Sequence, residues 1–342
     1  MARSNIVADL LSEYGNRARA LLSQYLPRSE PRRYLYDPVA DYPSRGGRAM
    51  RPTLCLATTK LFGGNFERAL PTAVSIELFH NALLIHDDIE DESDMRRGKP
   101  TMHAQWGVPM AVNIGDALTL LSLRPLFDNV RTLGPRLTLR LVSETENMAR
   151  ESAEGQALEL GWRLDNRTDI TQRDYLEMVL KKTCWLATIH PMRTGALIAT
   201  QGAVDVAAFV RYGLFVGAAF QIQDDLLNLT GDEKKYGKEL GGDLFEGKRT
   251  LMLIHLFEQA TPSEREKLGH ILTIPRQSKT EADVRWIRDR MDSYGSIEHA
   301  VRSRDAMSAA AQNELTKITR GLPGSRDKDF LEALATWVVE RT

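Results

Sequence analysis

Two stretches of the chain end an apolar run in paired carboxylates. In the first, the run that begins at Leu70 ends at Asp87, Asp88 and Asp91. If this run is helical, Asp87 and Asp91 lie one turn apart on one face, with Cβ atoms about 5–6 Å from each other. Two carboxylates this close repel unless a cation lies between them, and Mg²⁺ prefers carboxylate and phosphate oxygens. The first stretch therefore predicts a magnesium site.

The second stretch repeats this pattern far away in the sequence, where an apolar run ends in Gln221, Asp224, Asp225 and Asn228. Basic residues follow both stretches, namely Arg96, Arg97 and Lys99 after the first and Lys238, Lys248 and Arg249 after the second. A single acidic run is usually a solvated helix end. Two acidic runs that are each followed by basic residues instead indicate that both runs face one cavity and bind phosphate groups.

Other polar residues fit an anion site less specifically. Gly46-Gly47 precedes Arg48 and Arg51. Glycines let the backbone approach a ligand closely, and arginines three residues apart can converge on a diphosphate. A basic turn before a helix is more often only a solvated boundary. His80 lies two turns before Asp87, and we expect it to point into the cavity, although a lone histidine on an apolar helix is usually a core residue.

The composition argues against several classes of protein. The chain has 342 residues, 42% hydrophobic and 27% charged, which suits a globular protein with a large core. Its net charge of −1 gives no field that would attract nucleic acid. No run approaches the ~20 apolar residues of a membrane span, and residues 1–26 lack the apolar core of a signal peptide. Cys55 and Cys184 have no metal or redox spacing, so we expect a cytoplasmic protein.

Helical periodicity extends over almost the whole chain, and no strand-period segment of any length occurs. Prolines at positions 27, 31, 38 and 43 predict an irregular connection. Since no linker divides the chain, we expect one all-α domain, residues 1–342, folded as a single large helical bundle with a central cavity. The predicted helices cover residues 6–26, 53–62, 67–89, 109–130, 137–160, 171–183, 204–229, 251–258, 263–272, 280–294, 297–318 and 328–339.

The ordered motifs GGRAMRP, DDIED followed by RRGKPT, KKT, FQIQDD and GKELGGDLFEGKRT closely resemble the trans-isoprenyl diphosphate (polyprenyl) synthases. The resemblance runs from about Gly46 to Thr250, with a looser match on either side. Each motif is weak alone, but the set in this order is specific. It implies a helical fold of the isoprenoid synthase type, usually homodimeric, that condenses isopentenyl diphosphate with an allylic diphosphate.

The resemblance also implies roles for single residues. Asp87, Asp91 and Asp224 would hold three Mg²⁺ ions on the allylic diphosphate, and Asp88 would belong to the catalytic set. The direct diphosphate ligands would be Arg96, Lys182 and Lys238, with Lys248 as a further substrate-binding cation. Isopentenyl diphosphate would bind at Arg48, Arg51, His80 and Arg97. Thr183 and Gln221 match the positions that steady the allylic cation.

The chemistry explains these residue types. Breaking an allylic carbon–oxygen bond leaves a carbocation and a departing diphosphate, and metal ions with Lys and Arg stabilise the charge that grows on the leaving group. The double bond of isopentenyl diphosphate then attacks the cation, and a proton is lost. Because both substrates are anionic and must be held head to tail, two separate basic clusters are required.

The chain departs from the family pattern at two positions. The usual Lys-Arg pair after Gly-Gly is Arg48-Ala49 here, and the lost charge at Ala49 is expected to weaken isopentenyl diphosphate binding. The second acidic motif ends in Asn228 instead of Asp. Since Asp224 is the family's main ligand in that motif, we expect activity to survive.

Product length should follow from the depth of the cavity beneath the first aspartates. Leu83 and Ala82 lie one turn below Asp87, where members of the family that stop at fifteen carbons often carry aromatic residues. Phe79, two turns below, could form a floor. By analogy with the family, geranylgeranyl diphosphate, with twenty carbons, is the first choice, with farnesyl or longer products as alternatives. Ala82→Phe should shorten the product, and Phe79→Ala should lengthen it.

Two rival interpretations come from other classes. A class I terpene cyclase also ionises a prenyl diphosphate with Mg²⁺, but it needs no second anion site and carries a different second metal motif. A non-catalytic partner subunit of a prenyl synthase would be expected to lose metal ligands, whereas the acidic residues of both motifs are present. Only the departures at Ala49 and Asn228 support the interpretation as a non-catalytic subunit.

Overall fold

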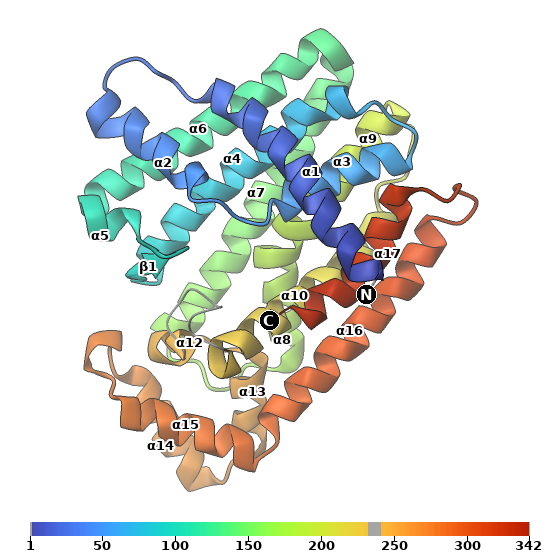
Figure 1. Cartoon of the computed structure of the whole chain (residues 1–342). Helices are drawn as coiled ribbons and strands as arrows, with labels where there is room; N and C mark the ends of the chain where they lie inside the picture. The colour runs from blue at the N-terminus through green and yellow to red at the C-terminus, as the bar shows by residue number, and fades with distance from the viewer. Residues whose placement is uncertain (1, 232–240, 342) are drawn as a thin grey trace. The chain divides into compact units, whose positions relative to one another are not determined.

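The computed structural model describes residues 2–231 and 241–341, and its elements are almost all helical (Figure 1). This confirms the all-α prediction. The helices are α1 (Ala2–Tyr25), α2 (Asp37–Ser44), α3 (Met50–Leu61), α4 (Phe66–Glu90), α5 (Met102–Trp106), α6 (Val108–Leu133), α7 (Pro135–Leu164), α8 (Gln172–Val179), α9 (His190–Thr200), α10 (Ala208–Thr230), α12 (Gly242–Glu246), α13 (Leu251–Gln259), α14 (Pro262–Thr273), α15 (Glu281–Ser293), α16 (Ser296–Ile318) and α17 (Arg326–Glu340). Among these residues no helix is both long and apolar enough to cross a bilayer.

The remaining elements are short or have another helical period. They are the π-helices η1 (Arg32–Tyr36) and η2 (Leu180–Ile189), the 3-10 turn η3 (Arg276–Ser278), and the strands β1 (Met95–Arg96) and β2 (Lys99–Pro100), which pair antiparallel. The hairpin does not alter the fold class.

The chain divides into two compact units. The first contains Met1–Met148, Leu186–Arg211 and Glu314–Leu334, and the second contains Ala149–Trp185, Tyr212–Asn313 and Ala335–Thr342. Single helices such as α7 begin in one unit and end in the other. Each acidic motif has its own unit, because Asp87 belongs to the first and Asp224 to the second.

In the first unit, α4 is buried along most of its length, as expected for a helix that is apolar on all sides. It packs against α3 and α6, and α1 crosses over α3 and α4 (Figure 1). An apolar cluster joins α4 residues such as Val74, Leu78 and Ile85 to Ile114 and Leu118 of α6. This packing fixes the helix whose last turn carries the first acidic motif.

The prediction of an irregular connection over the prolines was wrong at its second half. Residues 32–44 form η1 and then α2. Pro38 lies in the first turn of α2, where a missing N–H costs nothing, and Pro43 lies one residue before the helix ends. The sequence reasoning treated every proline as a breaker, although the first turn of a helix tolerates one.

In the second unit, α8 begins as predicted, with Thr171 and Asp174 forming a capping box. The helical path runs through Lys181, Lys182 and Thr183, as predicted, and continues through η2 and α9 to Thr200. A π-helix has a wider turn, which a 3.6-residue pattern cannot signal.

Candidate active site

The first acidic motif lies at the end of α4. Asp87 and Asp88 are in its last turn, and Asp91 is the C-cap residue, whose backbone N–H donates to the carbonyl oxygen of Asp87 at 2.9 Å. The side chain of Asp87 is 25% exposed, whereas that of Asp88 is buried. Asp87 and Asp91 are therefore one turn apart, as the sequence predicted.

Arg96 is shared between the first two aspartates. Its Nη2 donates to Asp87 Oδ2 at 3.1 Å, and its Nε donates to Asp88 Oδ1. The hydroxyl of Tyr42, in α2, donates to Asp88 Oδ2 at 2.9 Å. Burial alone would lower the pKa of Arg96, but Asp88 and Asp87 outweigh it and raise that pKa, so the guanidinium stays charged.

A second group of charges lies earlier on α4. Glu77 and His80 are buried, with Glu77 Oε2 3.7 Å from His80 Nδ1. Burial lowers the pKa of His80 to about 4, and Arg51 adds to this, so the imidazole is neutral at neutral pH. Burial alone would raise the pKa of Glu77, but His80, Arg51 and Arg97 together lower it. The structure therefore brings Arg51, His80 and Arg97 around one buried carboxylate.

Sequence reasoning missed Glu77. The available signal was its spacing, because Glu77 precedes His80 by three residues on the same helix and such residues are neighbours.

Arg97 lies in the turn of the β1–β2 hairpin. Arg97 and Gly98 have φ values of 54° and 72°, as a type I′ turn requires at its two central positions. Gly47 approaches the guanidinium so closely that a Cβ there would lie 2.9 Å from Arg97 Nη2. The Gly-Gly loop therefore brings its own basic residue, the exposed Arg48, to the same side of the unit as Arg97.

The structure gives a packing reason for Ala49. Ala49 is buried, is the N-cap of α3 and has a left-handed φ of 50°. A Cβ added to Gly15 of α1 would lie 2.7 Å from the Cβ of Ala49. Because α1 and α3 are this close, a longer basic side chain at position 49 would have to displace α1.

The two aspartates of the second motif, on α10, have different environments. The side chain of Asp224 is 40% exposed and accepts a hydrogen bond from Arg341 Nη2 at 2.9 Å. Asp225 is buried, and burial raises its pKa well above the ordinary value, with Asp243 adding to the effect. Of this pair, Asp224 presents the more accessible carboxylate.

Asn228 caps a neighbouring helix. It is buried, and its Oδ1 accepts a hydrogen bond from the backbone N–H of Asp243 at 3.1 Å, in the first turn of α12. The departure at Asn228 therefore has a local structural role.

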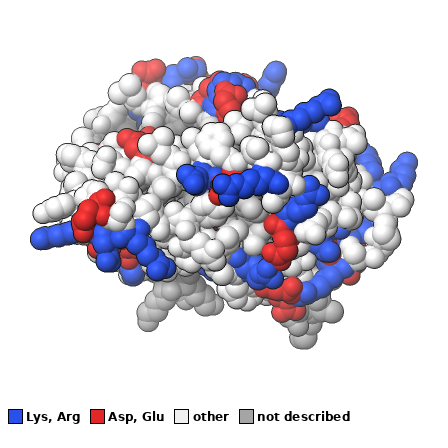
Figure 2. Space-filling view, turned by 90° about the horizontal axis from the view of Figure 1, so that it is seen from above, with Lys and Arg blue, Asp and Glu red and all other residues white. Residues whose placement is uncertain are grey.

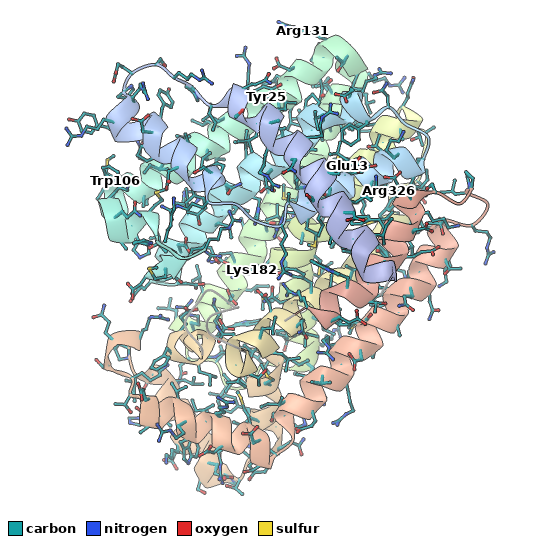
Figure 3. All side chains as sticks on the ribbon, viewed as in Figure 1. Glu13, Tyr25, Trp106, Arg131, Lys182 and Arg326 are labelled. Atoms are coloured by element: carbon teal, nitrogen blue, oxygen red, sulfur yellow. The ribbon has the colours of Figure 1, made fainter. Side chains whose placement is uncertain are left out.

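Lys182 and Thr183 lie in the first turn of η2. Lys182 forms an ion pair with Glu159 of α7, and Figure 3 labels its side chain. The hydroxyl of Thr183 donates to Gln221 Oε1 at 2.8 Å, which brings the two residues predicted to face the cation into contact. Glu159 and Arg341 were both missed, because nothing in their local sequence marks them as partners of the motifs.

The two other predicted basic ligands differ in outcome. Lys248 lies 2.8 Å from Glu246 and 3.6 Å from Asp243, so acidic residues surround it. Lys238 lies outside the described residues.

The residues predicted to set product length do not share one environment. Ala82 is fully buried and belongs to the apolar cluster with α6, which also contains Tyr42. Among the described residues, Phe79 and Leu83 are outside that cluster; Phe79 is buried and Leu83 is half-buried.

Within residues 2–231 and 241–341, no three His, Cys, Asp or Glu side chains are grouped closely enough to hold a metal ion. Of the three predicted metal ligands, Asp87 and Asp91 belong to the first unit and Asp224 belongs to the second. The donor atoms of all three are carboxylate oxygens, which Mg²⁺ prefers.

Comparison with known proteins identifies the family. The Polyprenyl synthetase family matches residues 32–291, so the chain belongs to that family and is a trans-prenyltransferase. A short chain isoprenyl diphosphate synthase from Methanothermobacter thermautotrophicus is 35% identical over 86% of this chain and 87% of its own length. A geranylgeranyl pyrophosphate synthase from Geoglobus acetivorans is 30% identical over 98% of this chain and 99% of its own. The crystal structure of a geranylgeranyl pyrophosphate synthetase from Pyrococcus horikoshii superimposes with a TM-score of 0.86, 33% identity and full coverage of both chains.

Proposed function

We propose that the protein condenses isopentenyl diphosphate head to tail with an allylic diphosphate in a Mg²⁺-dependent reaction, and that its main product is geranylgeranyl diphosphate. The observation that carries the proposal is Arg96, a permanently charged guanidinium held between Asp87 and Asp88. The geranylgeranyl synthases among the relatives, which align over nearly the whole chain, support the twenty-carbon product.

Asp87, Asp91 and Asp224 would hold the Mg²⁺ ions that bridge to the allylic diphosphate. When bound, these ions supply charge stabilisation to the leaving group. Arg96 and Lys182 would bind and orient the diphosphate, with Lys238 and Lys248 as further cations. Because Arg96 keeps its charge, it stabilises a departing anion at every pH in the ordinary range.

Isopentenyl diphosphate would bind at Arg48, Arg51, His80 and Arg97. The neutral His80 can donate a hydrogen bond to this substrate without adding charge. The Glu77 carboxylate balances part of the charge of Arg51 and Arg97. Two basic groups, one formed by Arg96 at Asp87 and one around Glu77, fit the need to hold two anions head to tail.

Thr183 and Gln221 would face the allylic cation. The Nε2 of Gln221 donates to Asp225 Oδ1 at 2.8 Å, which fixes the amide so that Oε1 accepts from Thr183. With its proton donated to Gln221, the Thr183 hydroxyl would present its oxygen to the carbon where positive charge develops.

We further propose that both units work together as one synthase domain, residues 1–342, and that the protein is a homodimer. Exposed apolar side chains on α6 and its neighbours support an interface: Trp106, Val108, Val112, Leu120, Phe127, Val130 and Leu139. Trp106 lies at the outer edge of α5 (Figure 3), and uncharged atoms cover wide areas between the charged groups in Figure 2. Light scattering of the purified protein tests this assembly.

Neither cysteine forms a disulfide, which supports a cytoplasmic location.

The test of function incubates the purified protein with Mg²⁺, isopentenyl diphosphate and, separately, the five-, ten- and fifteen-carbon allylic primers. The dephosphorylated alcohols are identified by mass. A Mg²⁺-dependent twenty-carbon alcohol is expected. A shorter or longer alcohol would support the proposed reaction but contradict the proposed product length. A cyclic hydrocarbon would support the terpene cyclase, and no product would support the non-catalytic subunit.

A further inference from the structure

The β1–β2 hairpin is too short to hold its own position. It contains two residue pairs, Met95 with Pro100 and Arg96 with Lys99. Even longer two-stranded hairpins are marginally stable alone, and binding groups must be held within about 0.5 Å of their productive positions. Contacts from outside the hairpin must therefore fix Arg96.

Helix α2 lies on the same side of the first unit as the hairpin (Figure 1) and contacts the acidic motif through Tyr42. Tyr42 is fully buried, and its hydroxyl donates to Asp88 Oδ2 at 2.9 Å, while Asp88 Oδ1 accepts from Arg96 Nε. Both oxygens of Asp88 are therefore engaged. Asp88 acts as a bridge that transmits the position of Tyr42 to Arg96.

The end of α2 also contacts the second strand. The buried guanidinium of Arg45 donates from Nη1 to the carbonyl oxygen of Pro100 at 2.7 Å and from Nε to Asp41 Oδ2 at 2.8 Å. Asp41 Oδ1 in turn accepts from Lys99 Nζ at 3.2 Å. Residues 41 and 45 therefore hold β2, which is paired to β1.

The Arg45 guanidinium also lies over the ring of Tyr42, 5.1 Å from its centroid. This contact joins the two sets of interactions into one group of side chains, because a shift of either residue disturbs the other.

From these contacts we propose that Asp41, Tyr42 and Arg45, here called the α2 clamp, are positioning residues that hold Arg96 for the allylic diphosphate. The inference deepens the proposed function and rests on it for the identity of the substrate. The clamp residues touch no substrate themselves and act through Asp88 and the hairpin backbone.

The two parts of the clamp have different consequences. The Tyr42 hydroxyl acts through Asp88 on Arg96, so its removal with the ring kept in place should weaken only the allylic site. Arg45 acts on the backbone of the whole hairpin, which also carries Arg97. Its loss should therefore weaken binding of both the allylic and the isopentenyl substrate.

The experiment compares Tyr42→Phe with Tyr25→Phe, using the full chain and Mg²⁺ and varying one substrate at a time. Tyr25 is a matched control, because its hydroxyl also donates to an aspartate in the first unit, Asp128 Oδ2, at 3.1 Å, and this aspartate does not belong to the acidic motif. Loss of a hydrogen bond to a charged group predicts that Tyr42→Phe raises the KM of the allylic substrate about tenfold. The KM of isopentenyl diphosphate should stay unchanged, as should both values in Tyr25→Phe.

The proposal is overturned if Tyr42→Phe and Tyr25→Phe behave alike, or if Tyr42→Phe raises both KM values together. Arg45→Gln, which should raise both, provides the second variant if Tyr42→Phe does not fold. Thermal melting of all three variants separates lost folding from lost positioning.

A binding measurement distinguishes failure of this inference from failure of the proposed function. Titration calorimetry with inorganic diphosphate and Mg²⁺ needs no turnover. If the wild-type protein makes no prenyl product, the proposed function fails. The clamp is then judged by whether diphosphate binds more weakly to Tyr42→Phe than to Tyr25→Phe, and equal binding rejects it.

Discussion

At the scale of single residues, the second acidic motif is organised as a chain of oriented hydrogen bonds. The buried hydroxyl of Tyr175 donates to Asp225 Oδ2 at 2.9 Å, and Gln221 donates to Asp225 Oδ1 at 2.8 Å. The amide of Gln221 is then fixed with Oε1 toward Thr183. An oriented network of this kind is worth more in a buried site than in water, because competing water is excluded. Tyr175 therefore influences Thr183 without touching it.

Replacing Tyr175 with Phe should lower kcat about tenfold and leave both KM values unchanged, since Asp225 loses one of its two anchoring donors. The matched control is Tyr294→Phe, because Tyr294 donates to Glu264 at 2.6 Å, also within the second unit. Steady-state kinetics checks the prediction. Equal effects of the two substitutions, or a change in KM alone, would show that Tyr175 does not orient the pair Gln221 and Thr183.

At the scale of elements, η2 must approach α7 closely to place Lys182 beside Glu159. Gly155 of α7 permits this approach, because a Cβ there would lie 2.2 Å from the backbone nitrogen of Lys182. In the sequence alone, Gly155 is only a glycine that interrupts the helical pattern over residues 137–160. The structural reason for a glycine at position 155 is the close approach of η2.

Gly155→Ala should destabilise the protein by about 1–3 kcal/mol, as overpacking does, and should lower activity because η2 moves with Lys182 and Thr183. Gly161→Ala is the control on the same helix. Nothing lies within 4 Å of a Cβ at Gly161, so this change should stabilise by about 0.5–1 kcal/mol through helix propensity. Urea unfolding and the prenyl transfer assay measure both effects, and a Gly155→Ala protein as stable as wild type would contradict the packing argument.

The sequence was informative where the signal is local and periodic. It predicted α4 within one residue at each end and placed Asp87 and Asp91 one turn apart. It could not predict Tyr42, Glu159 or Arg341, because each meets its motif only through contacts between residues distant in sequence. The π-helical register of η2 was also hidden, since it changes the turn without changing the residue types.

At the scale of the whole molecule, the pH dependence of stability should reflect two buried histidines that are neutral in the folded protein. Burial lowers the pKa of His80 to about 4 and that of His190 to about 3. His190 lies in the first turn of α9, with its Nε2 3.1 Å from the Thr145 hydroxyl. The unfolded chain takes up protons on these side chains below about pH 6.5, whereas the folded protein does not. Their contribution is therefore complete above pH 6.5 and is lost as the pH falls toward the folded-state values.

His190→Gln isolates one of these contributions. Between pH 7 and pH 5 the wild-type free energy of unfolding should fall by about 2 kcal/mol more than that of His190→Gln, because Gln cannot take up a proton in the unfolded chain. Urea unfolding at the two pH values measures the difference. His270→Gln, which makes the same substitution at an exposed histidine, is the control. If His190→Gln loses as much stability on acidification as wild type, acid must act on the fold through groups other than this buried imidazole.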